Sequence, residues 1–336
     1  MRTTVRVAAV QAEPSWLRLS DGVDQVVELI RAAAVQGARL VAFPEAFLPG
    51  YPWWRWIDTN QWNVEYSTRC RENSMTRDGA EMRAITAAAA AHDIHVVLGF
   101  GERQERRIYM SQAVIDDSGQ LLSVRRKAGL NSVERKIFAS GTPNLPAVHH
   151  TPIGKYGALS GQENQRPLLT RALRADEEQI HVAAWPGSPD GDAVGPESST
   201  TLSRMYALEV GAYVIAPTSV IGDAAFGGVG SAQRHNGGPA GCARIYGADG
   251  GEVVAPLAVG EEGILYADLE IAVSLADNQP CDSVRTTRDR KDNTRKDSVP
   301  TRRGSRRVAA GWQSGPDRWA LPATSLGAYP GGTAAC

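Results

Sequence analysis

Long apolar runs and paired cysteines are both missing from this 336-residue sequence. No run approaches the ~18 uninterrupted apolar residues that a membrane-spanning helix needs, so we expect a cytoplasmic protein with no membrane partner. The four cysteines, Cys70, Cys242, Cys281 and Cys336, show no paired spacing and no CxxC motif, which argues against a disulfide framework and a zinc site. Because the histidines also lack the spacing of metal ligands, we predict neither a metal nor a cofactor.

A large charge excess is missing as well, since the formal net charge is −1. This balance hides one basic segment, residues 282–307, in which ten Lys and Arg accompany four Asp for a local charge of +6. The segment has very few apolar residues, and we predict that residues 276–336 form a basic, poorly ordered tail on a folded domain of residues 1–275. It has no aromatic ring to stack on bases, and its Asp residues dilute the positive field, so nucleic acid is not an expected partner.

Alternating strand and helix patterns predict an α/β fold for the folded domain. Unbroken apolar cores indicate strands buried on both faces at Val5–Gln11 and Arg39–Phe43, and apolar residues at helical spacing indicate helices at Asp21–Gln36 and Asp78–Ala91. Further strands are expected at Ile94–Phe100, Tyr109–Ile115, Leu121–Arg126, Tyr156–Leu159, Gln179–Trp185, Tyr213–Ala216, Cys242–Tyr246, Glu252–Ala255 and Gly263–Leu269, and a further helix at Ser199–Val210. The simplest architecture for this pattern is a sheet with helices on its outer faces, wound twice.

Two features after the second expected strand suit a binding site. Glu45 follows that strand directly, and α/β proteins commonly have their sites at the carboxyl ends of buried strands. The segment Leu48–Trp56 is dense in Pro, Gly and aromatic residues, which is typical either of a loop that roofs a pocket or of a loop that packs on the core. In the first interpretation, Tyr51, Trp53, Trp54 and Trp56 supply the rings of the roof and leave room for an apolar or aromatic ligand.

A second candidate site is the corner at Ser160–Asn164. The strand Tyr156–Leu159 runs into a turn at Gly161, and a helix is expected from Asn164 to Leu173. Free backbone N–H groups at the start of that helix would stabilise a carbonyl, a carboxylate or a nitrile nitrogen. The corner contains no strong nucleophile, because Ser160 is its only hydroxyl and it has no cysteine.

Several motifs together resemble the nitrilase branch of the carbon-nitrogen hydrolase superfamily. Phe43–Trp54 (FPEAFLPGYPWW) is similar to the motif that carries the first carboxylate of that family. Arg125–Lys127 (RRK) followed by Val133–Arg135 (VER) is similar to its lysine region, and Gly157–Leu168 to its nucleophile elbow. Framework motifs have counterparts at Ile180–Gly187 (IHVAAWPG), Ser203–Glu209 (SRMYALE) and Glu261–Leu269 (EEGILYADL), so the similarity covers about Val5–Leu269.

The resemblance implies a four-layer α-β-β-α sandwich, a homo-oligomer, and hydrolysis of a nitrile to a carboxylic acid and ammonia. In the family, a cysteine thiolate attacks the nitrile carbon, a glutamate acts as base and acid, and a lysine stabilises the developing negative charge. By motif, the family's glutamate corresponds to Glu45 and its lysine to Lys127. Glu134 corresponds to an assisting glutamate. The expected ligand is a nitrile or a related amide or carboxylate. The residues expected to contact it are Tyr51, Trp53, Trp54, Gln162, Glu163, Asn164 and Trp185.

The nucleophile is where the sequence departs from the family. Matched without gaps through Glu163-Asn164, the family's cysteine falls on Gly161, which has no atom that could bond to a substrate. Ser160 is adjacent, but neighbouring strand side chains point in opposite directions, and a neutral hydroxyl is a weaker nucleophile than a thiolate. Residues 128–132 also replace the Pro-Thr-His of the family's lysine loop, and the basic segment replaces its C-terminal signature.

Four interpretations are open at this point. The first is a nitrile-hydrolysing enzyme with reduced or altered activity, which the retained Glu45, Lys127 and Glu134 favour. The second is a catalytically inactive relative that binds a small molecule or serves as an oligomer subunit, which Gly161 favours. In the third, the basic tail binds nucleic acid or an anionic surface. In the fourth, Gly161 and the tail are alterations of an ordinary nitrilase sequence.

Overall fold

The computed structural model of the protein describes residues 2–56, 60–187, 196–226 and 241–272. All of them belong to one structural unit, which spans Met1–Pro280. The tail predicted at residues 276–336 lies outside the described residues, as do Cys281 and Cys336. None of the helices in the described ranges is both long enough and apolar enough to cross a membrane.

The first of two β-sheets is built around the N-terminal strand. Among the described residues it has seven strands, in the order β10-β1-β2-β3-β4-β5, with β12 paired to β1 in addition. The strands are β1 (Arg2–Ala12), β2 (Leu40–Ala42), β3 (His95–Gln104), β4 (Arg107–Ile115), β5 (Leu121–Arg126), β10 (Thr218–Ser219) and β12 (Gly263–Ala272). Because β1, β2 and β3 pair in parallel, their carboxyl ends lie at one edge of the sheet.

The second sheet has five strands in the described part of the chain, in the order β11-β9-β8-β7-β6. They are β6 (His149–Thr151), β7 (Gly154–Ser160), β8 (Ile180–Ala184), β9 (Tyr213–Ala216) and β11 (Arg244–Tyr246). β7, β8 and β9 pair in parallel, so their carboxyl ends also meet at one edge. The chain therefore forms two separate sheets, and the single sheet that the strand pattern alone suggests is wrong.

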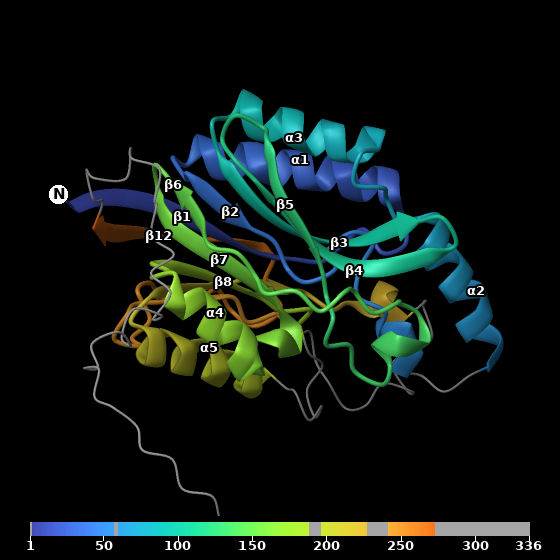
Figure 1. The fold of residues 1–336 in the computed structure, drawn as a ribbon. Helices are drawn as coiled ribbons and strands as arrows, with labels where there is room; N and C mark the ends of the chain where they lie inside the picture. The colour runs from blue at the N-terminus through green and yellow to red at the C-terminus, as the bar shows by residue number, and fades with distance from the viewer. Residues whose placement is uncertain (1, 57–59, 188–195, 227–240, 273–336) are drawn as a thin grey trace, which may run out of the picture. The chain divides into compact units, whose positions relative to one another are not determined.

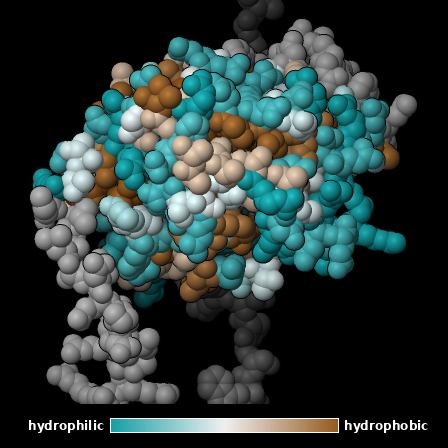
Figure 2. Space-filling model, turned by 90° about the horizontal axis from the view of Figure 1, so that it is seen from above, coloured by the Kyte–Doolittle hydropathy of each residue, from teal (hydrophilic) through white to brown (hydrophobic). Residues whose placement is uncertain are grey.

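Helices cover the outer face of each sheet (Figure 1). α1 (Leu19–Val35) and α3 (Ala80–Ala91) lie on the first sheet, and α4 (Pro167–Ala175) and α5 (Pro196–Val210) lie on the second. Seen from above, hydrophilic side chains surround a smaller set of apolar ones on the face of α1 and α3 (Figure 2). The connections contain α2 (Asn60–Glu72) and the 3₁₀ helices η1 (Trp53–Trp56), η2 (Glu134–Lys136), η3 (Gly161–Gln165) and η4 (Asp223–Phe226). The predicted four-layer α-β-β-α sandwich is confirmed.

The sequence of β1 explains the layering. Successive side chains of a strand point to opposite faces, so Ala8 and Val10 pack toward the helices α1 and α3, while Val7 and Ala9 pack against the second sheet. Both faces are buried, which is why the strand is a continuous apolar run instead of an alternating one.

The structure corrects several of the predicted elements. The helix α2, the strand β6 and the hairpin of β3 with β4 were not predicted, whereas β4 and β5 match two of the expected strands and pair with each other. The strand expected at Glu252–Ala255 is reduced to one bridge between Tyr246 and Glu252. The helix expected from Asn164 to Leu173 divides into η3 and α4, because Pro167 has no backbone N–H and fits only the first turn of an α-helix.

Candidate active site

Glu45 lies where the carboxyl end of β2 meets the second sheet. Its backbone N–H donates to the carbonyl oxygen of Trp185, which follows β8, at an N–O distance of 3.3 Å. The backbone of Pro44 and Ala46 passes so close to Gly99 in β3 that a Cβ atom on this glycine would collide with both. Glycine at position 99 therefore permits the turn that buries the side chain of Glu45 to 2% exposure.

Lys127 joins two carboxylates in the protein interior. Its Nζ donates to Oε1 of Glu45 at 2.6 Å and to Oε1 of Glu134 at 2.8 Å. Lys127 directly follows β5 and Glu134 begins η2, so the hairpin and its loop bring both residues to a glutamate 82 positions before the lysine. All three side chains are buried. One ammonium group and two carboxylates leave one negative charge without compensation, which is costly in a buried site.

The two carboxylates accept different numbers of hydrogen bonds. Glu134 accepts from Lys127, from the hydroxyl of Tyr51 at 3.1 Å and from the backbone N–H of Asn131 at 2.9 Å. Within the described residues, Glu45 accepts from Lys127 alone. Burial raises the pKa of Glu45 to about 7, and the attraction of Lys127 offsets this only in part. Glu45 is therefore the carboxylate that can bind and release a proton near neutral pH.

The charge of Lys127 follows from the same neighbours. Burial by itself lowers the pKa of this ammonium group, but the nearby carboxylates of Glu45 and Glu134 outweigh burial, and the pKa of Lys127 is raised. Lys127 therefore carries a positive charge throughout the physiological pH range. A fixed positive charge in a buried position can stabilise negative charge that develops on a bound molecule.

Asn131 holds Glu134 through reciprocal hydrogen bonds. Oδ1 of Asn131 accepts from the backbone N–H groups of Val133 at 2.9 Å and Glu134 at 2.8 Å, while Oε2 of Glu134 accepts from the backbone N–H of Asn131. The Nδ2 group of Asn131 also donates to the hydroxyl of Tyr51 at 3.2 Å. Asn131 was not predicted as a site residue, although the Asn-x-x-Glu spacing is the signal of such a capping box.

The corner after β7 brings Gly161 against Glu45. Ser160 is extended (φ −108°, ψ 124°), whereas Gly161 has a φ of +49°, in the left-handed region that favours glycine. The Nδ2 group of Asn164 donates to the carbonyl oxygen of Gly161 at 2.9 Å and closes the turn. A Cβ atom built on Gly161 would lie 3.0 Å from Oε1 of Glu45 and closer still to Oε2.

Two buried networks hold this corner in place. Arg125 of β5 donates two hydrogen bonds to Glu163, at 2.6 and 2.8 Å. On the other side, Oδ1 of Asn164 lies 2.8 Å from Nε2 of His181, and Nδ1 of His181 lies 3.0 Å from Oε1 of Glu178. Glu163 and Asn164 were expected to contact the substrate, but their polar groups form these internal contacts.

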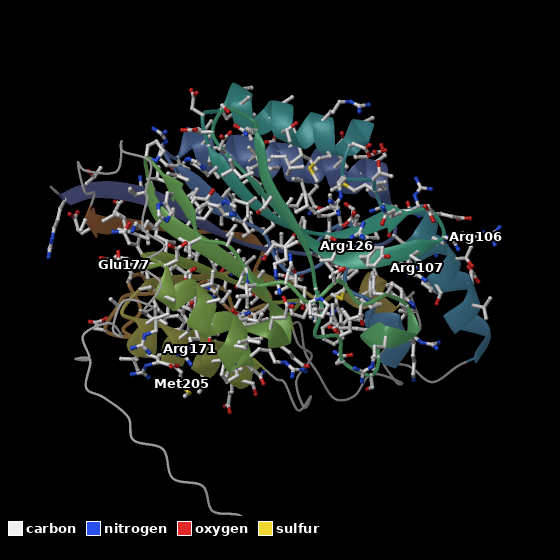
Figure 3. All side chains as sticks on the ribbon, in the orientation of Figure 1. Arg106, Arg107, Arg126, Arg171, Glu177 and Met205 are labelled. Carbon is white, nitrogen blue, oxygen red and sulfur yellow. The ribbon has the colours of Figure 1, made fainter. Side chains whose placement is uncertain are left out.

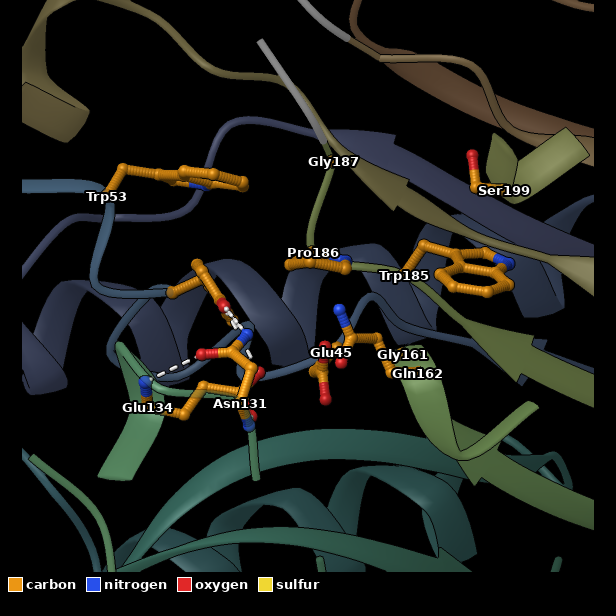
Figure 4. A pocket seen from close by; sticks show the side chains of 11 residues that line it. Glu45, Trp53, Asn131, Glu134, Gly161, Gln162, Trp185, Pro186, Gly187 and Ser199 are labelled. Carbon is orange, nitrogen blue, oxygen red and sulfur yellow. Dashed lines mark hydrogen bonds between the residues drawn. The ribbon is translucent and has the colours of Figure 1, made fainter. Parts of the chain in front are cut away.

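A narrow hollow opens beside Glu45 and Gly161 (Figure 4). Its volume is about 40 Å³, whereas a cavity that holds benzene has about 150 Å³. The hollow therefore fits the reacting end of a substrate, and a bound aromatic ring would require side chains to move. It is lined by Glu45, Tyr51, Trp53, Asn131, Glu134, Gly161, Gln162, Trp185, Pro186, Gly187 and Ser199.

Only some of the residues that were expected to contact the substrate line the hollow. Four of them line the hollow: Tyr51, Trp53, Gln162 and Trp185. Trp54, Glu163 and Asn164 do not, and the ring of Trp54 packs 5.8 Å from that of Tyr66, measured between centroids. Pro186, Gly187 and Ser199 were missed; the first two come just after Trp185 at the end of β8, and their position at the carboxyl end of a parallel strand was the available signal.

Nucleophilic side chains are scarce around the hollow. None of the described residues that line it carries a thiol, and Ser160 is buried outside it. Cys70 and Cys242 are buried elsewhere, and burial raises the pKa of both thiols, that of Cys70 to about 12. Among the described residues, His, Cys, Asp and Glu also form no group of three that could hold a metal ion.

Known proteins share both the sequence and the fold of this chain. The family model for carbon-nitrogen hydrolases matches residues 6–275. A nitrilase of Pseudomonas syringae pv. syringae is 40% identical over 281 residues, which cover 81% of this chain and 83% of the relative. An aliphatic nitrilase of Rhodococcus rhodochrous is 39% identical over 289 residues, which cover 84% and 79%.

An amidase from Nesterenkonia sp. has a similar solved structure, with a TM-score of 0.63 over 79% of this chain and 90% of that one. Its sequence is 20% identical, so this likeness concerns the fold alone. The family match and the two relatives, by contrast, cover most of the chain at the level of sequence. The chain therefore belongs to the carbon-nitrogen hydrolase family, in the branch of the nitrilases.

Proposed function

We propose that the hollow beside Glu45 is a nitrilase-type site whose ligand is a nitrile, or a related amide or carboxylate. The observation that carries this proposal is the buried ammonium group of Lys127, which lies between Glu45 and Glu134 where a hollow with aromatic walls opens. Relatives of similar length are named nitrilase and aliphatic nitrilase, which supports the substrate class. The reaction of such a site is hydrolysis of a nitrile to a carboxylic acid and ammonia.

In this proposal Glu45 transfers protons and Lys127 stabilises charge. With a pKa of about 7, Glu45 can take a proton from an attacking group and deliver one to the departing nitrogen at neutral pH. The ammonium group of Lys127 stabilises the negative charge that develops on the nitrile nitrogen. Glu134 keeps this ammonium group in position and is itself fixed by Asn131 and Tyr51.

We propose that Gly161 stands at the position of the nucleophile. A side chain there would point at the carboxylate of Glu45, which is where a base must lie to accept the nucleophile's proton. Glycine cannot form a covalent bond to the substrate, so the route through a thioimidate is closed. Loss of the central member of a catalytic unit typically costs ~10⁴ to 10⁶ in rate, and we expect turnover to be lower than that of a cysteine-containing nitrilase by such a factor.

The second candidate function is small-molecule binding without turnover. Gly161 favours it, because the charged groups around the hollow are retained while the nucleophile is absent. Such a catalytically inactive homologue would bind a nitrile, amide or carboxylate and release it unchanged. It would act as a binding protein or as a subunit of an oligomer.

Ammonia release from a panel of aliphatic and aromatic nitriles, with Gly161→Cys tested beside the unmodified chain, separates these functions. We expect no release by the unmodified chain and hydrolysis by Gly161→Cys. If both are inactive but calorimetry detects nitrile binding, the inactive homologue is supported; if neither turns over nor binds, the proposed site is wrong. Turnover by the unmodified chain that disappears in Ser160→Ala would contradict the position that we propose for the nucleophile.

We also propose that the protein is a homo-oligomer that associates through α4 and α5. Leu168 of α4 and Met205 and Leu208 of α5 are 71%, 58% and 55% exposed. Met205 and Arg171 line one groove on this outer side (Figure 3). Exposed apolar side chains on neighbouring helices favour association, and light scattering should show a smaller particle for Met205→Glu/Leu208→Glu.

Two further expectations complete the proposal. We propose that residues 276–336 are a tail separate from the domain of residues 1–275, and that the protein is cytoplasmic. Limited proteolysis should then remove the tail and leave the domain intact. Cell fractionation checks the location.

A further inference from the structure

A second, larger groove lies next to the candidate active site. Its volume is about 860 Å³, and it is formed by η1, α2, the turn between β3 and β4, and the segment that begins with η2. Its floor contains the apolar residues Ile108, Ile137 and Phe138. None of the described residues lines both the groove and the narrow hollow beside Glu45.

Positive charge is concentrated in this groove. Five of the described residues that line it are cationic and none of them is acidic; the cations are Arg55, Arg71, Arg106, Arg107 and Lys136. They come from four segments of the chain, and Figure 3 shows Arg106 and Arg107 at the end of the β3–β4 hairpin. The fold therefore brings these charges together, although like charges repel.

None of the five cationic side chains forms a hydrogen bond or ion pair with a described residue. A neighbouring cluster shows the opposite pattern, since Arg77 and Arg126 both donate to the buried carboxylate of Glu102. Arginines on this side of the molecule are thus paired where the chain supplies a carboxylate. The groove differs, because none of the described residues that line it has a carboxylate.

Arg55 differs from the other four cations because it is only partly exposed. Its Nε atom is buried and has no hydrogen-bond partner among the described residues. Leaving a buried charged donor without an acceptor is costly, and such groups are uncommon in native proteins. Water cannot reach this Nε atom, and an anion in the groove cannot reach it either. The Nη groups of Arg55 are not among the buried atoms that lack a partner, so they and the four exposed cations are the donors available to an anion in the groove.

We propose that this groove binds a small oligophosphate, a molecule with two or more linked phosphate groups. Guanidinium groups bind phosphate oxygens through two parallel hydrogen bonds, and four of the five cations are arginines. Several linked phosphates match a groove with cations on several walls better than a single small anion does. The apolar floor provides a surface for an organic group attached to the phosphates.

Isothermal titration calorimetry of the full chain with inorganic pyrophosphate tests this proposal. We expect saturable binding that weakens as NaCl is added, because salt screens exposed charges. The double variant Arg106→Ala/Arg107→Ala should bind roughly tenfold more weakly or worse, since each lost charged hydrogen bond is of that order. Arg103→Ala is the matched control: Arg103 is exposed on the same hairpin but does not line the groove, and its variant should bind normally.

Several results would overturn the proposal. Absence of saturable binding would do so, as would equal weakening by Arg103→Ala and the double variant, which would indicate only a general effect of charge. Citrate binding as tight as pyrophosphate binding would show that the groove does not select phosphate. If pyrophosphate does not bind and the double variant changes the oligomeric state, the occupant is an acidic segment of a second copy. None of these measurements depends on nitrile turnover, so they stand apart from the proposed function.

Discussion

The carboxylate of Glu45 occupies the space that a side chain on Gly161 would need. An added Cβ atom would lie 3.0 Å from Oε1 and from Cδ of Glu45, and closer to Oε2. Glu45 is also bound to Lys127 at 2.6 Å, so it cannot move without disturbing the buried ion pair. Any residue other than glycine at position 161 must therefore shift a charged network.

Gly161→Ala should lower the free energy of unfolding by about 2–4 kcal/mol. A φ of +49° costs a residue with a Cβ atom ~1–2 kcal/mol, and the displacement of Glu45 adds to this. The control is Gly211→Ala, since Gly211 has a φ of +73° but nothing within 4 Å of an added Cβ. In urea denaturation, the control should lose only the part of the free energy of unfolding that comes from the strained backbone. Equal losses in the two variants would mean that Glu45 moves aside freely.

Lys127→Met should destabilise the protein by about 3–5 kcal/mol, because it leaves two buried carboxylates without their cation. Lys155→Met is the control, since Lys155 pairs at the surface with Glu177, whose side chain is 84% exposed. An exposed pair of this kind contributes up to ~1 kcal/mol. Chemical denaturation at neutral pH compares the two variants, and a similar loss in both would show that Lys127 is not an essential counter-ion.

Stability should fall between about pH 4.5 and pH 7 in the unmodified protein relative to Glu45→Gln. The pKa of Glu45 is about 7 in the fold, against 4.5 in the unfolded chain. Between these values the folded state keeps a proton that the unfolded state releases, so stability is lost as pH rises through this interval. The loss is roughly 3 kcal/mol, from 1.4 kcal/mol per pKa unit.

The quantity to measure is the difference in the free energy of unfolding between the unmodified protein and Glu45→Gln, obtained by urea denaturation at each pH. Burial lowers the pKa of His95 and His149, and these groups change stability in the opposite direction over part of the same range. Both histidines are present in Glu45→Gln, so their contribution cancels in the difference. Parallel stability curves would show that Glu45 does not take up a proton on folding.

Asn131→Ala should cost about 1–2 kcal/mol, the usual effect of removing an N-terminal cap. The variant loses the acceptor for the N–H groups of Val133 and Glu134 and the donor to Tyr51. Ser132→Ala is the control because Ser132 is exposed in the same segment. Thermal unfolding should separate the two. In a Gly161→Cys background, Asn131→Ala should also reduce nitrile turnover, because Glu134 and Lys127 are then less well positioned.

Local patterns in the sequence were sufficient to predict most of the helices and strands. The continuous apolar run of β1 and the helical spacing of α1 predicted both elements to within a few residues. The helix α2 was missed because its apolar residues are few, so no periodic apolar face marks it as a helix. The division at Pro167 was also missed, although proline chemistry alone would have predicted it.

The sequence by itself determined the layered elements, the charged residues that the site contains and the absence of a nucleophilic atom at Gly161. Only the tertiary structure decided which side chains meet: Glu45 and Lys127 lie 82 positions apart yet share a buried hydrogen bond. It also placed Glu163 against Arg125 instead of in the hollow. The physical reason is that periodicity and turn chemistry act over a few residues, whereas these contacts depend on how two sheets pack and on which buried charges find partners.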